Sequence, residues 1–224
     1  MRVTAALALI LMAAAAAPGA AQGADRRVPV DPNAPPWNAV AKVQTNIGGK
    51  CSGVLIAPAV VLTAAHCLYN PRTRAMLQPL SLHVLFGYQR AVYRWHRLVT
   101  RFTIGAGFAG GRPQTSDWAR LELVEPVPVP PLPLAGEAAT SGMAVALAGY
   151  NQDRAQLLMA DSACHVLRVA ALPGGAFVTH DCAGTRGTSG GPLLARQGEG
   201  WAVIGIAIAA GPGENVALAP SFDK

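Results

Sequence analysis

The chain has 224 residues, a formal net charge of +6 and 51% hydrophobic residues. The positive charge is concentrated in residues 32–116, which contain nine Lys or Arg residues and no Asp or Glu. No zinc-finger, basic-zipper or RNA-binding motif accompanies this charge, so specific nucleic-acid binding is not expected. An ordinary solvated surface is the simpler explanation, and we expect at most a weak attraction for polyanions.

Residues 1–23 have the features of a secretory signal peptide. Arg2 supplies the positive start, Ala5–Ala17 is an uncharged apolar run of 13 residues, and small residues follow it. The run is well short of the roughly 20 residues that a membrane-spanning helix needs, and no other stretch is long and apolar enough. We therefore expect a secreted or periplasmic protein without a membrane span.

The rest of the chain predicts strands and few helices. Residues 24–36 are polar and proline-rich, which indicates an extended N-terminal arm. Short apolar runs separated by turns then predict strands, at Val54–Ile56, Val60–Thr63, Leu80–Phe86, Leu121–Val124, Ala144–Gly149, Leu167–Ala171 and Val203–Ile208. The prolines between 125 and 134 remove ladder donors and indicate a connector. The prediction is an all-β chain with one β-unit at 37–124 and another at 135–224.

Two short motifs and one aspartate carry the chemistry. Thr63–Cys67 reads T-A-A-H-C and contains His66, and Gly187–Gly191 reads G-T-S-G-G and contains Ser189. Asp117 lies between them in Ser-Asp-Trp-Ala. A serine hydroxyl is a poor nucleophile unless a base, held in one tautomer, takes its proton. Flanking glycines let a backbone approach a substrate and present N–H groups to it.

On these motifs, in the order His, Asp, Ser, the chain resembles the trypsin-like (chymotrypsin-fold) serine proteases, bacterial secreted branch. The resemblance implies two Greek-key β-barrels with the active site between them. It implies that Ser189 is the nucleophile, that His66 is the base, and that Asp117 accepts a hydrogen bond from His66. The backbone N–H groups of Gly187 and Ser189 are then expected to form the oxyanion hole.

Some residues compete with these assignments. The weaker candidates for the acid are Asp153, Asp161 and Asp181. The remaining histidines match no motif of the family and are expected to be structural or on the surface; they are His83, His96, His165 and His180.

Four cysteines in a secreted chain predict two disulfides, and three pairings are open. We expect Cys51–Cys67 and Cys164–Cys182, because each pair then lies within one half of the chain.

The family pattern is not followed everywhere. Animal trypsin-like enzymes carry Asp just before the nucleophile, where it pairs with a new N-terminus; this chain has Thr188 there. We therefore expect signal-peptide removal to suffice for activity, although Arg26-Arg27 before Val28 looks like a processing site. The pattern is closest to glutamyl-endopeptidase-like peptidases, but Ala207 stands where they carry their specificity His. Ile208 also replaces a Ser that the family usually places beside the triad Asp.

The resemblance places the specificity pocket just before the nucleophile and on a later strand. The expected lining is Ala183, Gly184, Thr185, Ala207, Ala209 and Ala210. These residues predict a small or uncharged side chain before the scissile bond.

The leading interpretation is a secreted serine endopeptidase that acts on proteins or peptides as a monomer, through an acyl-enzyme, with no metal and no cofactor. One alternative is a catalytically weak or silent cationic binding protein on the same fold. Another is esterase activity from the same triad. The order of the three residues excludes an α/β-hydrolase, which requires Ser before Asp and His.

Overall fold

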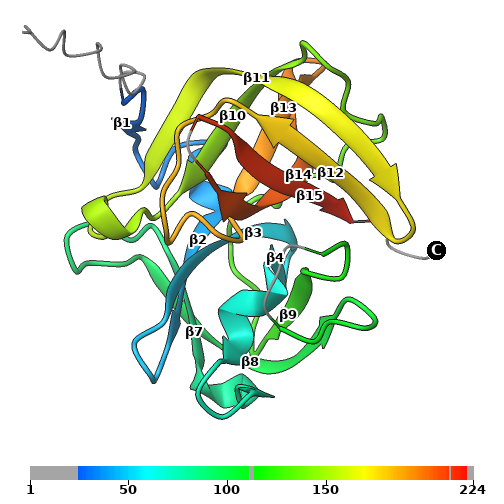
Figure 1. Cartoon of the computed structure of the whole chain (residues 1–224). Helices are drawn as coiled ribbons and strands as arrows, with labels where there is room; N and C mark the ends of the chain where they lie inside the picture. Colours follow the sequence, from blue (N-terminus) through cyan, green and yellow to red (C-terminus); the bar gives the residue numbers. More distant parts are fainter. Residues whose placement is uncertain (1–24, 111–113, 212, 221–224) are drawn as a thin grey trace, which may run out of the picture.

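The computed structural model describes residues 25–110, 114–211 and 213–220, so the expected signal peptide at 1–23 lies outside the described residues. Strands provide nearly all of the regular structure (Figure 1). The helical segments are short 3-10 turns, namely η1 (Trp37–Ala39), η2 (Ala65–Leu68), η3 (Pro79–Ser81) and η4 (Gln152–Arg154). Within the described ranges, no helix has the length and apolar character needed to cross a membrane.

The first half of the chain folds into a closed antiparallel barrel. Its strands follow the order β2 (Val40–Thr45), β3 (Lys50–Ala57), β4 (Val60–Thr63), β9 (Ala119–Leu123), β8 (Trp95–Ile104) and β7 (Leu82–Phe86). Alternate residues face inward, as the two-residue period of a strand requires; on β7, Leu82, Val84 and Phe86 pack into the core of this barrel. A small hairpin of β5 (Tyr69–Asn70) and β6 (Ala75–Met76) follows η2.

The second half forms another closed barrel. The order is β11 (Met159–Leu172), β10 (Ala144–Gly149), β13 (Pro192–Gln197), β14 (Gly200–Ala210), β15 (Asn215–Pro220) and β12 (Gly175–His180), and β12 pairs back with β11. The short strand β1 (Val28–Pro29), from the N-terminal arm, adds to the edge of β11. The predicted two-barrel, all-β fold is confirmed.

An apolar layer joins the two barrels. Val54 and Leu62 of the first barrel pack in one buried cluster with Leu194, Ile206 and Leu218 of the second. The segment after β9 contacts both barrels, because the N–H of Leu132 donates to Leu55 O (2.9 Å) and the N–H of Val203 donates to Pro133 O (2.9 Å). This layer fixes β3 and β4 against β13 and β14, which are the strands next to the two motifs.

Both expected disulfides are confirmed. Cys51 of β3 is bonded to Cys67 of η2, and Cys164 of β11 is bonded to Cys182 after β12. The first bond braces the corner that carries His66, and the second braces the segment that leads to Ser189.

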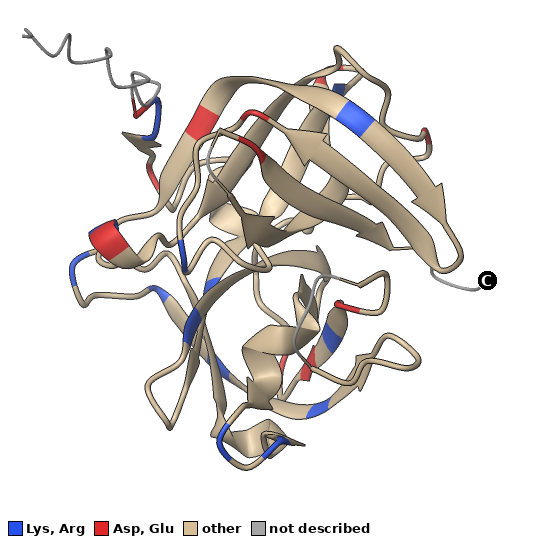
Figure 2. Cartoon of the chain, viewed as in Figure 1, with Lys and Arg blue, Asp and Glu red and all other residues tan. Residues whose placement is uncertain are grey.

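The charged residues are distributed unevenly, as Figure 2 shows. Lys and Arg of the first barrel are spread over several strands and loops. This spread does not test the expected weak attraction for polyanions, which stays a prediction.

Candidate active site

His66 and Asp117 are joined by strand pairing. β4 leads into η2, which carries His66, and β9 begins two residues after Asp117; β4 and β9 pair with Thr63 opposite Ala119. Asp117 Oδ2 lies 2.8 Å from His66 Nδ1, and Asp117 Oδ1 accepts the backbone N–H of His66 at 2.9 Å. The carboxylate is buried, whereas the imidazole is 30% exposed. Since Nδ1 donates to Asp117, the lone pair of the ring lies on Nε2.

The competing carboxylates are engaged elsewhere. Asp153 binds Arg27, Asp161 binds Arg26, and Asp181 accepts the backbone N–H of His165. Of the four candidate acids, Asp117 is therefore the one hydrogen-bonded to His66.

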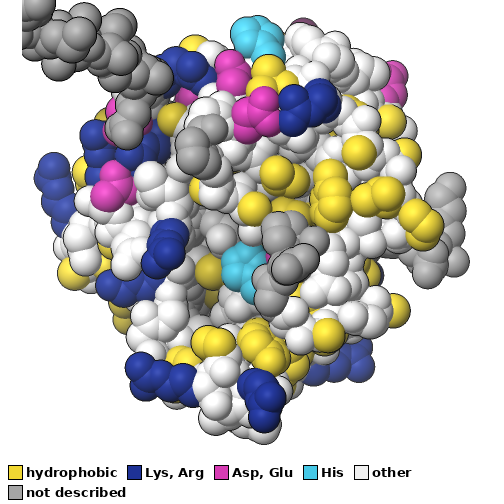
Figure 3. All heavy atoms as spheres, viewed as in Figure 1, with side chains coloured by type: hydrophobic (Ala, Val, Ile, Leu, Met, Phe, Trp, Pro, Cys, Tyr) yellow, Lys and Arg dark blue, Asp and Glu magenta, His cyan; other side chains and the backbone are white. Residues whose placement is uncertain are grey.

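The turn that carries Ser189 is held against the His66 corner. The carbonyl oxygen of Ser189 accepts the N–H of Ser52 at 2.8 Å and lies 3.8 Å from Cys67 Sγ. Gly190, with φ of +79°, packs so closely that an added Cβ would lie 2.9 Å from Ala64 N and overlap Ser52 O. Only glycine fits this approach. In Figure 3 a histidine side chain is visible at the middle of the face where the barrels meet.

The geometry of the turn leaves two N–H groups available. The N–H of Thr188 donates to Thr185 O (3.1 Å) and that of Gly190 donates to Ala207 O (2.7 Å). Across the residues that the structure covers, the N–H groups of Gly187 and Ser189 donate to no protein acceptor. Gly187 has φ of +93°, and a Cβ there would overlap Tyr150 O. Two unused donors beside a serine suit an oxyanion.

Two buried residues that the sequence analysis did not identify hold this turn. Ser52 Oγ donates to Gly187 O at 2.8 Å and accepts the N–H of Tyr150 at 2.8 Å. Asn151 Oδ1 accepts Thr188 Oγ1 at 2.7 Å and Thr185 N at 3.0 Å. An isolated serine and an isolated asparagine give no motif signal, so only the fold reveals them.

The expected pocket residues lie on two segments that Asn215 links. Asn215 Nδ2 donates to Cys182 O at 2.6 Å, next to Ala183, and its Oδ1 accepts Gly211 N at 3.2 Å, next to Ala210. Ala207 exchanges backbone hydrogen bonds with Gly190 and Gly191. The six predicted lining residues carry no charge.

Other features lie apart from this arrangement. His180 is fully buried on β12, and both ring nitrogens lack a partner among the described residues. Desolvation lowers its pKa to about 4, against the smaller opposing effect of Asp181 and Asp161.

His83 Nδ1 lies 2.9 Å from His96 Nε2 on the first barrel. A cavity of about 290 Å³ lined by Leu134, Val178 and other residues contains none of the candidate site residues.

Cys51, Cys67 and His66 gather their ligand-type atoms within 4.8 Å. The two sulfurs are bonded to each other, so neither is a thiolate that could bind a metal ion.

Comparison with known proteins agrees with the two-barrel fold. The Glu endopeptidase solved in complex with MPD is similar at a TM-score of 0.77 and 20% identity, covering 89% of this chain and 93% of that one. The Vibrio cholerae VesB protease is similar at 0.65 and 16%, covering 88% and 64%. The active form of the Rv3671c protease from M. tuberculosis is similar at 0.59 and 20%, covering 81% and 76%. No curated protein matches the chain in sequence.

At these identities the structural likeness concerns the fold. The family assignment rests on a family model for the trypsin-like peptidase domain, which matches residues 51–206, more than half of the chain. The chain therefore belongs to the trypsin-like peptidase family.

Proposed function

We propose that this protein is a secreted or periplasmic serine endopeptidase in which His66, Asp117 and Ser189 act as a catalytic triad. The observation that carries the proposal is the double hydrogen bond from His66 to buried Asp117, beside the glycine turn of Ser189. A buried carboxylate on Nδ1 holds the imidazole in the tautomer that can accept a proton at Nε2.

In the acylation step, Ser189 Oγ attacks the peptide carbonyl carbon and its proton passes to His66 Nε2. The new C–O bond converts the carbonyl oxygen into an oxyanion, which accepts the N–H groups of Gly187 and Ser189. Each such donor contributes about 3–4 kcal/mol to transition-state stabilisation. The imidazolium, stabilised by Asp117, then gives its proton to the amine as the C–N bond breaks.

The acyl group remains on Ser189 as an ester. In deacylation, His66 takes a proton from water, the water oxygen attacks the ester carbon, and the same two N–H groups bind the second oxyanion. The C–Oγ bond breaks, the acid is released, and the proton returns to Ser189. The reaction needs no group beyond the three side chains, the backbone and water.

The substrate class proposed is a protein or peptide with a small or uncharged residue before the scissile bond. Support comes from the alanines and glycine of the predicted pocket and from Ala207, where a glutamate-directed relative needs a histidine. The signal peptide expected at residues 1–23 and the two disulfides support an extracytoplasmic location.

The test compares wild type with Ser189→Ala. We expect wild type to react with a fluorophosphonate and to hydrolyse casein, and Ser189→Ala to do neither with its fold intact. Folded wild type that fails to react with the probe would sink the enzyme proposal and leave the cationic binding protein as the alternative. If wild type reacts with the probe and hydrolyses an ester substrate but does not hydrolyse casein, the protein is an esterase.

A further inference from the structure

The N-terminal arm places two adjacent arginines on opposite sides of one segment. We call residues 181–185, which contain the first three predicted pocket residues, the pocket wall. β1 pairs with β11, with Val28 opposite Ala160, and this pairing holds the arm beside the wall. Successive side chains of an extended chain point to opposite sides. Arg26 therefore reaches one end of the wall and Arg27 the other.

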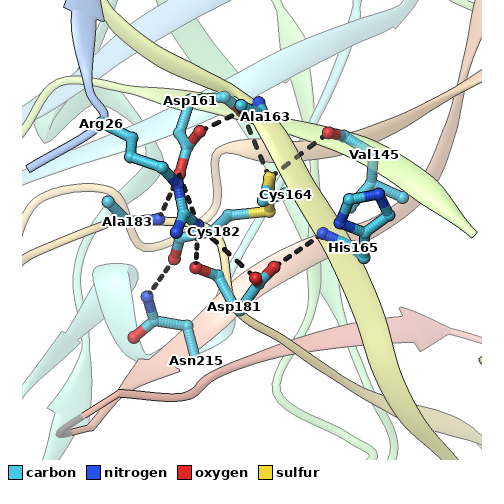
Figure 4. Close-up of a disulfide and its surroundings, with 10 residues drawn as sticks. All are labelled: Arg26, Val145, Asp161, Ala163, Cys164, His165, Asp181, Cys182, Ala183 and Asn215. Carbon is cyan, nitrogen blue, oxygen red and sulfur yellow. Dashed lines mark hydrogen bonds and ion pairs between the residues drawn. A yellow bond between two sulfur atoms is a disulfide. The ribbon is translucent and has the colours of Figure 1, made fainter. Parts of the chain in front are cut away.

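Arg26 contacts the start of the pocket wall, as Figure 4 shows. Its Nε lies 3.2 Å from Asp161 Oδ2, and its Nη2 donates to Asp181 O. Asp161 is fully buried and also accepts the N–H of Ala183 at 2.8 Å. Without Arg26, this carboxylate would lose its cationic partner, and an unpaired buried charge is strongly unfavourable.

Arg27 contacts the other end of the pocket wall, where its Nη1 donates to Thr185 Oγ1 at 3.4 Å. Its guanidinium binds both oxygens of Asp153, at 2.9 Å and 2.7 Å, and donates to Asn151 Oδ1 at 2.8 Å. The side chain is only 8% exposed. The hydrogen bond from Arg27 lowers the pKa of Asp153 to about 2, so that carboxyl stays charged in the folded protein.

Asn151 extends the contact to the nucleophile turn. The oxygen that accepts Arg27 also accepts the N–H of Thr185 (3.0 Å) and the hydroxyl of Thr188 (2.7 Å). Thr188 is the residue before Ser189. Arg27 of the arm and Thr188 of the nucleophile turn therefore bind the same acceptor, Asn151 Oδ1. That turn bears the nucleophile and the two free N–H groups.

We propose that Arg26 and Arg27 form an arginine clasp that positions the pocket wall and the turn 187–191, which we call the oxyanion turn, so that the attached arm activates the enzyme. The inference rests on the proposed function. It also predicts the effect of cleavage after Arg27: the cut removes both arginines, and activity falls. The dibasic sequence Arg26-Arg27 then serves as a site of inactivation.

The experiment compares forms that differ only in the arm. A long form beginning at Ala24, a short form beginning at Val28, Arg27→Ala and Arg27→Lys are assayed on one peptide, with kcat and KM measured separately. A misplaced oxyanion turn costs about 10²-fold in rate, so we expect kcat of Arg27→Ala and of the short form to fall between tenfold and 100-fold. Arg27→Lys keeps the positive charge, so its kcat should lie above that of Arg27→Ala. It should stay below wild type, because an ammonium cannot make the bidentate contact.

Two further measurements separate positioning from folding. Millimolar guanidinium should raise kcat of folded Arg27→Ala and leave Arg101→Ala unchanged, since Arg101 pairs with Glu122 on the exposed surface of the first barrel. Circular dichroism reports whether each form is folded; if Arg27→Ala does not fold, Arg27→Lys carries the comparison.

The outcomes distinguish the two proposals. If the long wild type neither labels with a fluorophosphonate nor cleaves peptide, the proposed function fails. If the long form is active and the short form or Arg27→Ala matches or exceeds its kcat, the clasp is overturned. Lower kcat with recovery by guanidinium supports it.

Discussion

Ser52 Oγ donates a 2.8 Å hydrogen bond to the carbonyl oxygen of Gly187, and so connects a strand of the first barrel to the turn 187–191 of the second. The same hydroxyl accepts the N–H of Tyr150, and Ser52 N donates to Ser189 O. Ser52 is fully buried. Three hydrogen bonds of one residue therefore set the turn relative to the corner that carries His66.

The first prediction concerns Ser52→Ala. Loss of the hydroxyl leaves a buried carbonyl and a buried N–H without their partner, at a cost of about 1–3 kcal/mol of stability. A shifted Gly187 should also lower kcat between about tenfold and about 100-fold. Denaturant unfolding and peptide hydrolysis measure the two effects.

Ser141→Ala is the matched control for Ser52→Ala. Ser141 Oγ also donates to a backbone carbonyl, that of Leu167 at 2.8 Å, but the bond is exposed. Its loss should change neither quantity appreciably. Equal behaviour of the two variants would contradict the role given to Ser52.

The sequence predicted those parts of the fold that show a clear hydrophobic pattern. Val60–Thr63 and Ala144–Gly149 were predicted with the bounds that the structure has. The strand predicted from Leu80 begins at Leu82, because Pro79 starts a 3-10 turn. β11 begins at Met159, eight residues before the predicted start at Leu167. The sequence did not show this first part of the strand, because the buried Asp161 interrupts the apolar pattern there. The predicted domain boundaries stay a prediction.

The residues that support the site could not be predicted for a different reason. His66 and Ser189 stand in motifs, and Asp117 stands before a patterned strand. Ser52 and Gly187, however, are 135 positions apart, and Arg27 and Asn151 are 124 apart. Contacts between single polar residues at such separations arise from barrel closure and docking, which local sequence does not encode.

The second prediction concerns Gly190→Ala. Ala at φ of +79° costs about 1–2 kcal/mol from backbone strain alone. Its Cβ would in addition overlap Ser52 O and Thr63 Oγ1, which are rigid parts of the first barrel. We therefore expect the turn to move and peptide hydrolysis to be lost.

Gly107→Ala separates the two effects at position 190. Gly107 has φ of +78°, yet a Cβ there meets nothing within 4 Å. This variant should show only the strain in thermal unfolding and retain full activity. An active Gly190→Ala enzyme would contradict the close packing of the turn.

The third prediction concerns Asp117→Asn. The amide places an N–H donor where Nδ1 of His66 needs an acceptor, and so favours the wrong tautomer. We expect kcat to fall about 10⁴-fold with little change in KM. Glu122→Gln, on the neighbouring strand β9 but paired with exposed Arg101, should leave kcat unchanged. If kcat of Asp117→Asn falls no further than kcat of Glu122→Gln, Asp117 is not the triad acid.

The fourth prediction concerns His180 and acid stability. Burial holds its pKa at about 4 in the folded protein, against 6.5 without the protein environment. Below pH 6.5 the unfolded chain therefore binds more protons at this residue than the folded chain, and the free energy of unfolding falls as the pH drops toward 4. At 1.36 kcal/mol per pKa unit, the loss amounts to about 3 kcal/mol.

His180→Leu tests this prediction because leucine is uncharged at every pH and suits a fully buried position in the second barrel. The slope of unfolding free energy against pH between 6.5 and 4 should be shallower in His180→Leu than in wild type, whatever the absolute stability of the variant. His165→Gln, an exposed position on β11, should keep the wild-type slope. If the unfolding free energies of wild type and His180→Leu fall equally with pH, the buried imidazole of His180 does not cause the acid sensitivity, and other groups do.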